Sequence, residues 1–181
     1  LILLEEAVKE KVDFVLGIST DKAAQVSGVY GASKLLMERL FTQFEKTYPD
    51  IMFRIVRYGN VLYSTGSVLC IWKNLIKQGK EVIVTEPKAT RFFWNVEQAI
   101  DLIFDCFHNA KDSTPYCPDM KSMRIDDLLQ AMVVKYGDGK EIPIKVIGLQ
   151  PGENLHEKVL EEGLASNEVE HFTVEEIMEL I

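Results

Sequence analysis

VDFVLGISTDKAAQVSGVYGASK, residues 12–34, is the part of the sequence that indicates the fold. The run VDFVLGIS at 12–19 is short, apolar and rich in β-branched side chains, which is typical of a buried parallel strand. From Tyr30 to about Lys46 the apolar residues recur at helical spacing, so a helix is expected there. A strand followed by a helix predicts an α/β unit.

The rest of the chain continues the alternation of helices and strands. Helical periodicity predicts helices over residues 1–10, 67–79, 95–110, 125–137 and 173–181. Short apolar runs bounded by turn residues predict strands over 51–59, 81–85 and 142–148. With no internal repeat or low-complexity tract, this order of elements predicts an α/β chain.

The composition is that of a globular protein of 181 residues with 47% hydrophobic side chains, enough for one domain or a domain with an appendage. Twenty basic and 28 acidic residues give a net charge of −8 without a dense Lys/Arg run, so no nucleic-acid partner is expected. No run approaches the roughly 18 apolar residues of a membrane span, and the start lacks a signal-peptide pattern. Three cysteines without C-x-x-C spacing fit a reducing compartment, and we expect a cytoplasmic protein with no membrane partner.

One element of a nucleotide-binding fold has no counterpart in the sequence. A doubly wound sheet begins with a strand, a Gly-rich turn and a helix. Neither G-x-G-x-x-G nor G-x-x-G-x-x-G occurs here, and Leu1 is not an initiator methionine. We therefore expect an α/β fold made of the second half of a Rossmann-like parallel sheet and a smaller α/β substrate-binding region. On this interpretation the chain as it stands is an inactive fragment of a longer enzyme.

Chemistry-bearing residues gather around the end of the first predicted strand. Ser19 and Thr20 lie where that strand ends, and open α/β sheets bind ligands at the carboxyl ends of their parallel strands. Tyr30 and Lys34 are one helical turn apart on the same face. A nearby ammonium stabilises a phenolate and makes a tyrosine usable as an acid or base. A solvated lysine beside a half-buried tyrosine has the same spacing, so this motif alone leaves both interpretations open.

An ordered series of motifs supports the catalytic interpretation: STDKAA, YGASK, RYGNVLYSTGSV, TRF, KSMRIDDLLQAM and PGENLHE. The series resembles the extended short-chain dehydrogenase/reductases that act on nucleotide sugars. Within them it is most similar to the UDP-N-acetylglucosamine 4,6-dehydratase (inverting) family of polysaccharide biosynthesis proteins. The resemblance runs from Leu1 to about Glu157. It implies a lyase that makes a UDP-4-keto-6-deoxy sugar with inversion at C5 for glycan biosynthesis.

The resemblance implies catalytic roles for Thr20, Asp21, Lys22, Tyr30 and Lys34. Tyr30 would take the proton from the sugar O4, Lys34 would favour the phenolate and hold the nicotinamide ribose, and Thr20 would hydrogen-bond O4. Lys22 would remove the C5 proton, and Asp21 would protonate the departing C6 hydroxyl. Without the surrounding motifs, Asp21 and Lys22 would be interpreted as a charge pair at the start of a helix.

The resemblance also implies binding residues. The cofactor would be NADP, with NAD as the alternative, held by Ser19, Tyr30, Lys34, Tyr58, Gly59, Asn60 and Val61. The substrate residues would be Asn60, Gly66, Ser67, Val68, Arg91 and Glu153. N–H groups that open a helix suit a diphosphate, and so does a planar guanidinium. Cation–π packing is the alternative for Arg91, which stands beside aromatic residues. No clustered Cys/His spacing occurs, so no metal site is predicted.

The predicted organisation has three parts. Residues 1–60 form the C-terminal half of a dinucleotide-binding domain, 61–157 a substrate-binding region, and 158–181 an acidic tail with a short helix. Besides the dehydratase, a UDP-sugar 4-epimerase of the same superfamily and a non-catalytic remnant remain open. Asp21 and Lys22 favour the dehydratase, because an epimerase needs no acid for a C6 hydroxyl. We expect a UDP-sugar as substrate and a homo-oligomer.

Overall fold

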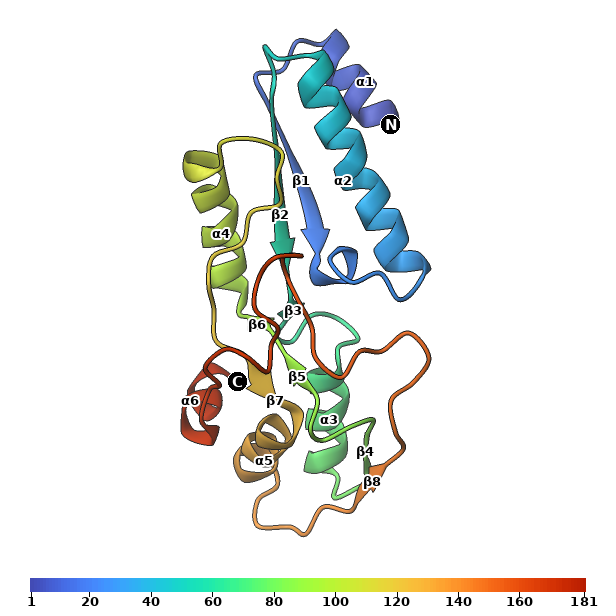
Figure 1. Ribbon diagram of the computed structural model, residues 1–181. Coiled ribbons are helices and arrows are strands. Elements are labelled where there is room, and N and C mark those ends of the chain that lie inside the picture. The colour runs from blue at the N-terminus through green and yellow to red at the C-terminus, as the bar shows by residue number, and fades with distance from the viewer. The chain divides into compact units, whose positions relative to one another are not determined.

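A computed structural model describes residues 1–181 (Figure 1), which divide into two compact units built from discontinuous segments. Unit 1 contains Leu1–Gly59, Glu97–Asp119 and Lys158–Gly163. Unit 2 contains Asn60–Val96, Met120–Glu157 and Leu164–Ile181. The division into three consecutive parts stays a prediction.

Unit 1 is a parallel strand pair with helices on both sides (Figure 1). Strands β1 (Phe14–Thr20) and β2 (Met52–Tyr58) pair in register from Phe14 opposite Met52 to Thr20 opposite Tyr58. Helices α1 (Ile2–Lys9) and α2 (Val29–Thr47) lie on one side of the pair, and α4 (Val96–Asn109) lies on the other. This arrangement confirms the predicted α/β class, since parallel strands need helical crossovers that cover their faces.

The core of unit 1 explains why α2 lies close to the strands. Phe41 of α2 packs edge-on against Phe53 of β2, and Phe53 and Ile55 are fully buried. A Cβ at Gly17 would lie 2.9 Å from the Phe41 ring, so the strand offers this ring room only because glycine stands there. Burial of each large apolar side chain contributes about 1.5–3 kcal/mol, which fixes the helix on the strands.

Unit 2 contains three short strand pairs. Parallel pairs form between β3 (Asn60–Val61) and β6 (Phe93–Trp94), and between β4 (Val82–Val84) and β8 (Ile144–Val146). The antiparallel pair joins β5 (Thr90–Arg91) to β7 (Met123–Arg124). The sequence predicts β4 and β8 but not the two-residue strands, because so short a segment carries no periodicity.

Three helices enclose the core of unit 2: α3 (Val68–Lys77), α5 (Ile125–Tyr136) and α6 (Val174–Leu180). The buried side chains of Ile76, Leu128 and Ile177 meet in one apolar cluster. At the start of α6 the Thr173 hydroxyl accepts the N–H of Glu176, whose carboxylate accepts the N–H of Thr173. This capping box satisfies N–H groups that a short helix would otherwise expose. None of the helices in either unit is long and apolar enough to cross a membrane.

Candidate active site

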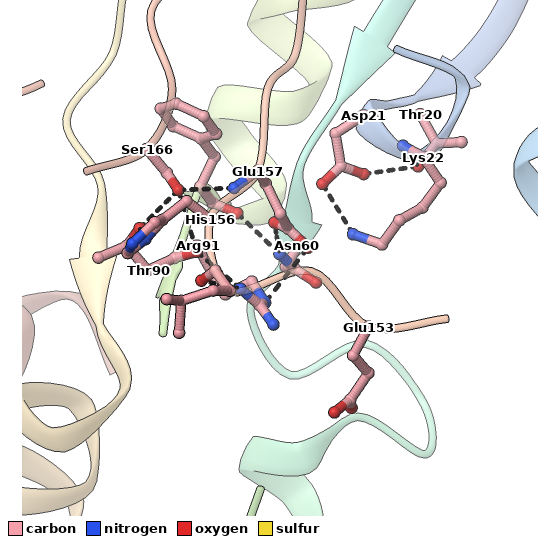
Figure 2. A network of polar contacts seen from close by, with 12 residues as sticks. Thr20, Asp21, Lys22, Asn60, Thr90, Arg91, Glu153, His156, Glu157 and Ser166 are labelled. Carbon is pink, nitrogen blue, oxygen red and sulfur yellow. Dashed lines mark hydrogen bonds and ion pairs between the residues drawn. The ribbon is translucent and has the colours of Figure 1, made fainter. Parts of the chain in front are cut away.

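The structure joins three predicted catalytic residues at the end of β1, where a 3₁₀ turn, η1 (Asp21–Ala23), begins. The Thr20 hydroxyl donates to Asp21 Oδ1 at 2.8 Å, and Lys22 Nζ donates to Asp21 Oδ2 at 2.8 Å (Figure 2). Asp21 is 3% exposed, and Lys22 is half-buried. A buried carboxylate therefore has each of its two oxygens engaged by a different predicted catalytic side chain.

A glycine allows the first turn of α2 to approach this cluster. A Cβ at Gly31 would lie 2.2 Å from the carbonyl oxygen of Lys22, so no larger residue fits without displacing the backbone. Gly31 directly follows Tyr30 in the sequence. The close approach therefore fixes the position of the Tyr30 backbone relative to Lys22.

Tyr30 and Lys34 occupy the first two turns of α2. The Tyr30 side chain is largely open to solvent, with 59% of the residue exposed. Lys34 Nζ donates to the carbonyl oxygen of Ile18 in β1 at 3.0 Å, which ties this lysine to the strand that ends at Thr20. The structure thus leaves the phenol accessible and anchors the ammonium one turn away.

Two residues expected to bind the cofactor have side chains engaged within unit 1. The buried Ser19 hydroxyl donates to Glu38 Oε1 at 2.5 Å. The Tyr58 hydroxyl donates to the carbonyl oxygen of Ala99 at 2.7 Å, and burial raises the pKa of Tyr58 to about 12. Contact with a cofactor through Ser19 would therefore involve its backbone groups, and the Tyr58 phenol is neutral near pH 7.

Sequence reasoning did not identify Cys117 as a neighbour of the catalytic cluster. Burial raises the pKa of its thiol to about 12 against the opposing charge of Arg57, and Asp119 and Asp21 add to the increase. The thiol is therefore protonated at physiological pH, which disfavours the thiolate that acts as a nucleophile. No group of three or more His, Cys, Asp or Glu side chains in the chain is placed to hold a metal ion.

In unit 2, one carboxylate holds two of the predicted substrate residues. Arg91 Nε lies 3.2 Å from Glu157 Oε1, and Asn60 Nδ2 donates to Glu157 Oε2 at 3.3 Å (Figure 2). Arg91 also donates to the carbonyl oxygens of Thr90 and Leu155. Glu157 is only 5% exposed. The Nε and Nη1 groups of the guanidinium are therefore held by three acceptor oxygens.

A chain of short hydrogen bonds fixes Glu157 itself (Figure 2). Ser166 Oγ accepts the Glu157 N–H at 2.8 Å and lies 2.6 Å from Thr90 Oγ1, which in turn lies 2.8 Å from His156 Nδ1. Burial lowers the pKa of His156, and the charges of Arg91 and His171 lower it further. Sequence reasoning missed Glu157 as a contact, although it ends the quoted motif PGENLHE. Ser166 lies beyond Glu157, outside all of the quoted motifs, and had no signal in the sequence.

The remaining predicted substrate residues lie outside that network. Gly66 has φ 77°. Ser67 is the N-cap residue of α3, and its hydroxyl donates to Cys70 Sγ instead of accepting a backbone N–H, so that side chain does not cap the first N–H groups of α3. Glu153 is exposed, and its carboxylate accepts the N–H of Gln150, closing a turn. Gly59 precedes β3, in which Val61 pairs opposite Trp94.

The chain resembles known proteins over nearly its whole length. The family model described as "Polysaccharide biosynthesis protein" matches residues 1–179. An uncharacterized membrane protein of Methanocaldococcus jannaschii is 39% identical over 87% of this chain and 50% of its own length. The UDP-N-acetylglucosamine 4,6-dehydratase (inverting) of Campylobacter jejuni is 31% identical, over 96% of this chain and 49% of the enzyme. The UDP-glucose 4-epimerase of Rickettsia akari is 32% identical, over 87% and 46%.

A solved structure supports the same relationship. Pen from Bacillus thuringiensis matches with a TM-score of 0.89 and 28% identity, covering 98% of this chain and 64% of Pen. The chain spans about half the length of these three curated relatives. These relatives include both a nucleotide-sugar dehydratase and a nucleotide-sugar epimerase.

Proposed function

The chain belongs to the polysaccharide biosynthesis protein family, and on this premise we propose that the whole protein is a UDP-N-acetylglucosamine 4,6-dehydratase. It would produce a UDP-4-keto-6-deoxy sugar with inversion at C5. The contact of Lys22 with the buried Asp21 carries the proposal, because elimination needs a base and an acid side by side. Three further residues, Thr20, Tyr30 and Lys34, complete the catalytic set.

Proton transfer within the Asp21–Lys22 contact would prepare both groups. In the ion pair the ammonium donates to the carboxylate across 2.8 Å. Moving that proton from Nζ to Oδ2 gives a neutral amine and a carboxylic acid. The amine can then accept the C5 proton, and the acid can donate its proton to the departing C6 hydroxyl, which leaves as water. The pair ends as ammonium and carboxylate, and the sugar is then a 4-keto-5,6-alkene. Return to C6 of the hydride taken from C4, with delivery of a solvent-derived proton to the opposite face of C5, would give the 6-deoxy product with C5 inverted.

Tyr30 and Lys34 suit the oxidation at C4 that makes the C5 hydrogen acidic. A bound nicotinamide cofactor, NADP or alternatively NAD, supplies the hydride chemistry. The residues present fit the nicotinamide end of such a cofactor, since an accessible phenol and an anchored ammonium lie one turn apart on α2. Tyr30 would accept the O4 proton and Thr20 would hydrogen-bond O4. Backbone groups of Ser19, Tyr58 and Gly59 in unit 1 would line the cofactor.

Groups of unit 2 would bind the substrate's diphosphate. Arg91 presents a planar guanidinium whose fork matches phosphate oxygens. Glu157 holds Arg91 and Asn60 together, so the two donors are preorganised as one group. The N–H groups at Gly66–Val68 would add hydrogen-bond donors at the N-terminus of α3, where the partial positive charge of the helix dipole favours an anion. Glu153, on the exposed turn at 150–153, is an acceptor and would contact a hydroxyl of the substrate, since a carboxylate repels the diphosphate.

An epimerase is the second candidate, because a UDP-glucose 4-epimerase is among the relatives at 32% identity. That reaction also oxidises C4 and would use Tyr30 and Lys34. It leaves C5 untouched and loses no water. Asp21 and Lys22 would then have no proton to exchange with the sugar.

Mass spectrometry of the reaction in heavy water separates the two candidates. The whole protein, incubated with UDP-N-acetylglucosamine, should yield a sugar lighter by one water with deuterium at C5. Lys22→Ala should abolish the elimination and the C5 exchange, whereas Lys46→Ala, an exposed lysine of α2, should leave both intact. An isomer of unchanged mass without deuterium at C5 would overturn the dehydratase proposal and support the epimerase.

A further inference from the structure

A buried carboxylate of α2 accepts hydrogen bonds from both strands of unit 1, at residues that lie opposite each other. Glu38, only 4% exposed, accepts the Ser19 hydroxyl at 2.5 Å and two bonds from Arg57, at 2.8 and 2.6 Å. Ser19 of β1 and Arg57 of β2 are directly opposite each other in the parallel register. The residues that follow them, Thr20 and Tyr58, end the two strands. Glu38 thus holds the strands together immediately before the predicted site.

Arg57 is completely buried, yet all its hydrogen-bonding capacity is used. A guanidinium has five N–H donors. Two go to Glu38, two go to Glu161, and the fifth goes to the carbonyl oxygen of Val159. Because no donor is left over, the side chain has a single well-defined position. A lysine, with three donors and no planar fork, cannot reproduce it.

One face of α2 meets β1 in a regular register. Tyr30, Lys34 and Glu38 are spaced four residues apart, so they share a helix face. Lys34 donates to the Ile18 carbonyl and Glu38 accepts the Ser19 hydroxyl, so successive helical turns contact successive strand residues. The predicted catalytic tyrosine is the next turn along this face. Its position relative to the strand end is therefore set by the contacts that the next two turns of the helix, at Lys34 and Glu38, make with β1.

We propose that Glu38 and Arg57 are positioning residues, whose buried ion pair fixes the register of α2 on β1 and so places Tyr30 relative to Thr20, Asp21 and Lys22. The proposal rests on the proposed function for its catalytic consequence. Neither residue needs to touch the substrate. Both act through Ser19 and through the helix that carries the tyrosine.

A second ion pair between the same two elements provides a matched control. Arg54 of β2 lies 3.1 Å from Glu45 of α2, and this glutamate accepts a serine hydroxyl as well, that of Ser113. This pair is partly buried, and Arg54 lies toward the opposite end of β2 from Tyr58. It has the same chemistry but no contact with the strand ends. Its loss should cost stability without displacing Tyr30.

The test compares Glu38→Gln and Arg57→Lys with Glu45→Gln and Arg54→Lys in the whole protein. The first two should lower kcat about ten- to a hundredfold, because a misplacement of about 1 Å in a catalytic group has that effect. KM for UDP-N-acetylglucosamine should stay within about threefold, since binding groups are untouched. The Glu45 and Arg54 variants should keep kcat. Equal losses of kcat in both pairs, or a loss confined to KM, would overturn the proposal.

Hydrogen exchange gives a readout that needs no activity. Glu38→Gln should raise amide exchange at residues 18–23, and Glu45→Gln should not. Ser19→Ala removes only the hydroxyl and serves if Glu38→Gln fails to fold; it should raise exchange over the same segment. Unchanged exchange in a folded Glu38 or Ser19 variant would overturn the proposal. If the wild type turns over no UDP-sugar, the proposed function fails while this measurement still decides the positioning role.

Discussion

The polar clusters of the two units are built in different ways. In unit 1, Thr20, Asp21 and Lys22 are consecutive residues that bond to one another at a strand end. In unit 2, Glu157 contacts Asn60 and Arg91, residues far away in the sequence. The cluster proposed for catalysis is thus encoded by a few neighbouring residues, whereas the cluster proposed for substrate binding depends on the folded arrangement of the whole unit. Substitutions in unit 1 should therefore affect chemistry, and those in unit 2 should affect binding.

Tyr30→Phe should give the largest effect. The substitution keeps the ring but removes the acceptor for the O4 proton, so hydride transfer should slow by roughly two to four powers of ten. Stopped-flow absorbance of the reduced nicotinamide in the whole protein measures this step. Cofactor affinity should survive, because Lys34 keeps its contact with Ile18.

Tyr48→Phe is the matched control. Tyr48 caps the other end of α2 and packs beside Phe44. Its loss of a hydroxyl should leave hydride transfer unchanged. A Tyr30→Phe enzyme within a few-fold of the wild type would mean that the phenol has no role in proton transfer.

Gly31→Ala should disturb unit 1 through packing. The added Cβ would meet the Lys22 carbonyl oxygen at 2.2 Å, so either η1 or α2 must move. Overpacking of this kind costs about 1–3 kcal/mol of unfolding free energy. Urea denaturation should show that loss, and kcat should fall with it.

Gly28→Ala is the control for Gly31→Ala. It tests whether the expected destabilisation comes from the close contact at Gly31 or from replacing any glycine near the start of α2. Gly28 caps α2 with extended backbone, and its Cβ would meet nothing within 4 Å. The variant should keep both stability and kcat. Equal destabilisation by both variants would contradict the close approach at Gly31.

The sequence predicted the long elements correctly, whereas the catalytic roles of the residues at the end of β1 stay a prediction. Strands β1 and β2 and helix α2 carry their own periodicity, and the Tyr30–Lys34 spacing is defined by the helix itself. Other contacts join residues that are far apart in the sequence. Arg57 and Glu161, for example, are separated by 104 positions, and most of unit 2 lies between them in the sequence. No local pattern records such a pairing. The role of Glu38 was missed for the same reason, although it lies one turn beyond Lys34.

Arg91→Lys should reveal the binding character of unit 2. The lysine keeps the charge but loses the fork that contacts Glu157 and would contact a diphosphate. Hydrogen bonds to charged groups contribute about 1.5–3 kcal/mol, so KM should rise roughly tenfold or more while kcat changes little. Steady-state kinetics in the whole protein measures both. Arg124→Lys, on the strand paired with β5, should leave KM unchanged; a fall in kcat alone for Arg91→Lys would place Arg91 in the chemistry.

Acidification should produce the smallest effect. As the pH falls, unit 2 should lose stability first and unit 1 second. Burial lowers the pKa of His156 below 6.5, so the folded state binds fewer protons there than the unfolded chain. The stability of unit 2 should therefore fall as the pH drops below about 6.5. Hydrogen bonds from Arg57 lower the pKa of Glu161 below 4.5, so its contribution is present above that pH and is lost as the pH falls through its folded pKa.

Hydrogen exchange, corrected for the intrinsic effect of pH on amide exchange, should detect this order. Between pH 7 and 5.5 the segments at 88–92 and 155–157 should loosen, while 55–59 stays protected by Arg57 until the pH falls below 4.5. His156→Gln cannot take up the proton and should remove the first change only. Glu161→Gln should remove the second, because it no longer gains charge-assisted bonds to Arg57 on deprotonation. Loosening of 55–59 first, or an unaltered response in His156→Gln, would show that neither group controls the acid sensitivity of its unit.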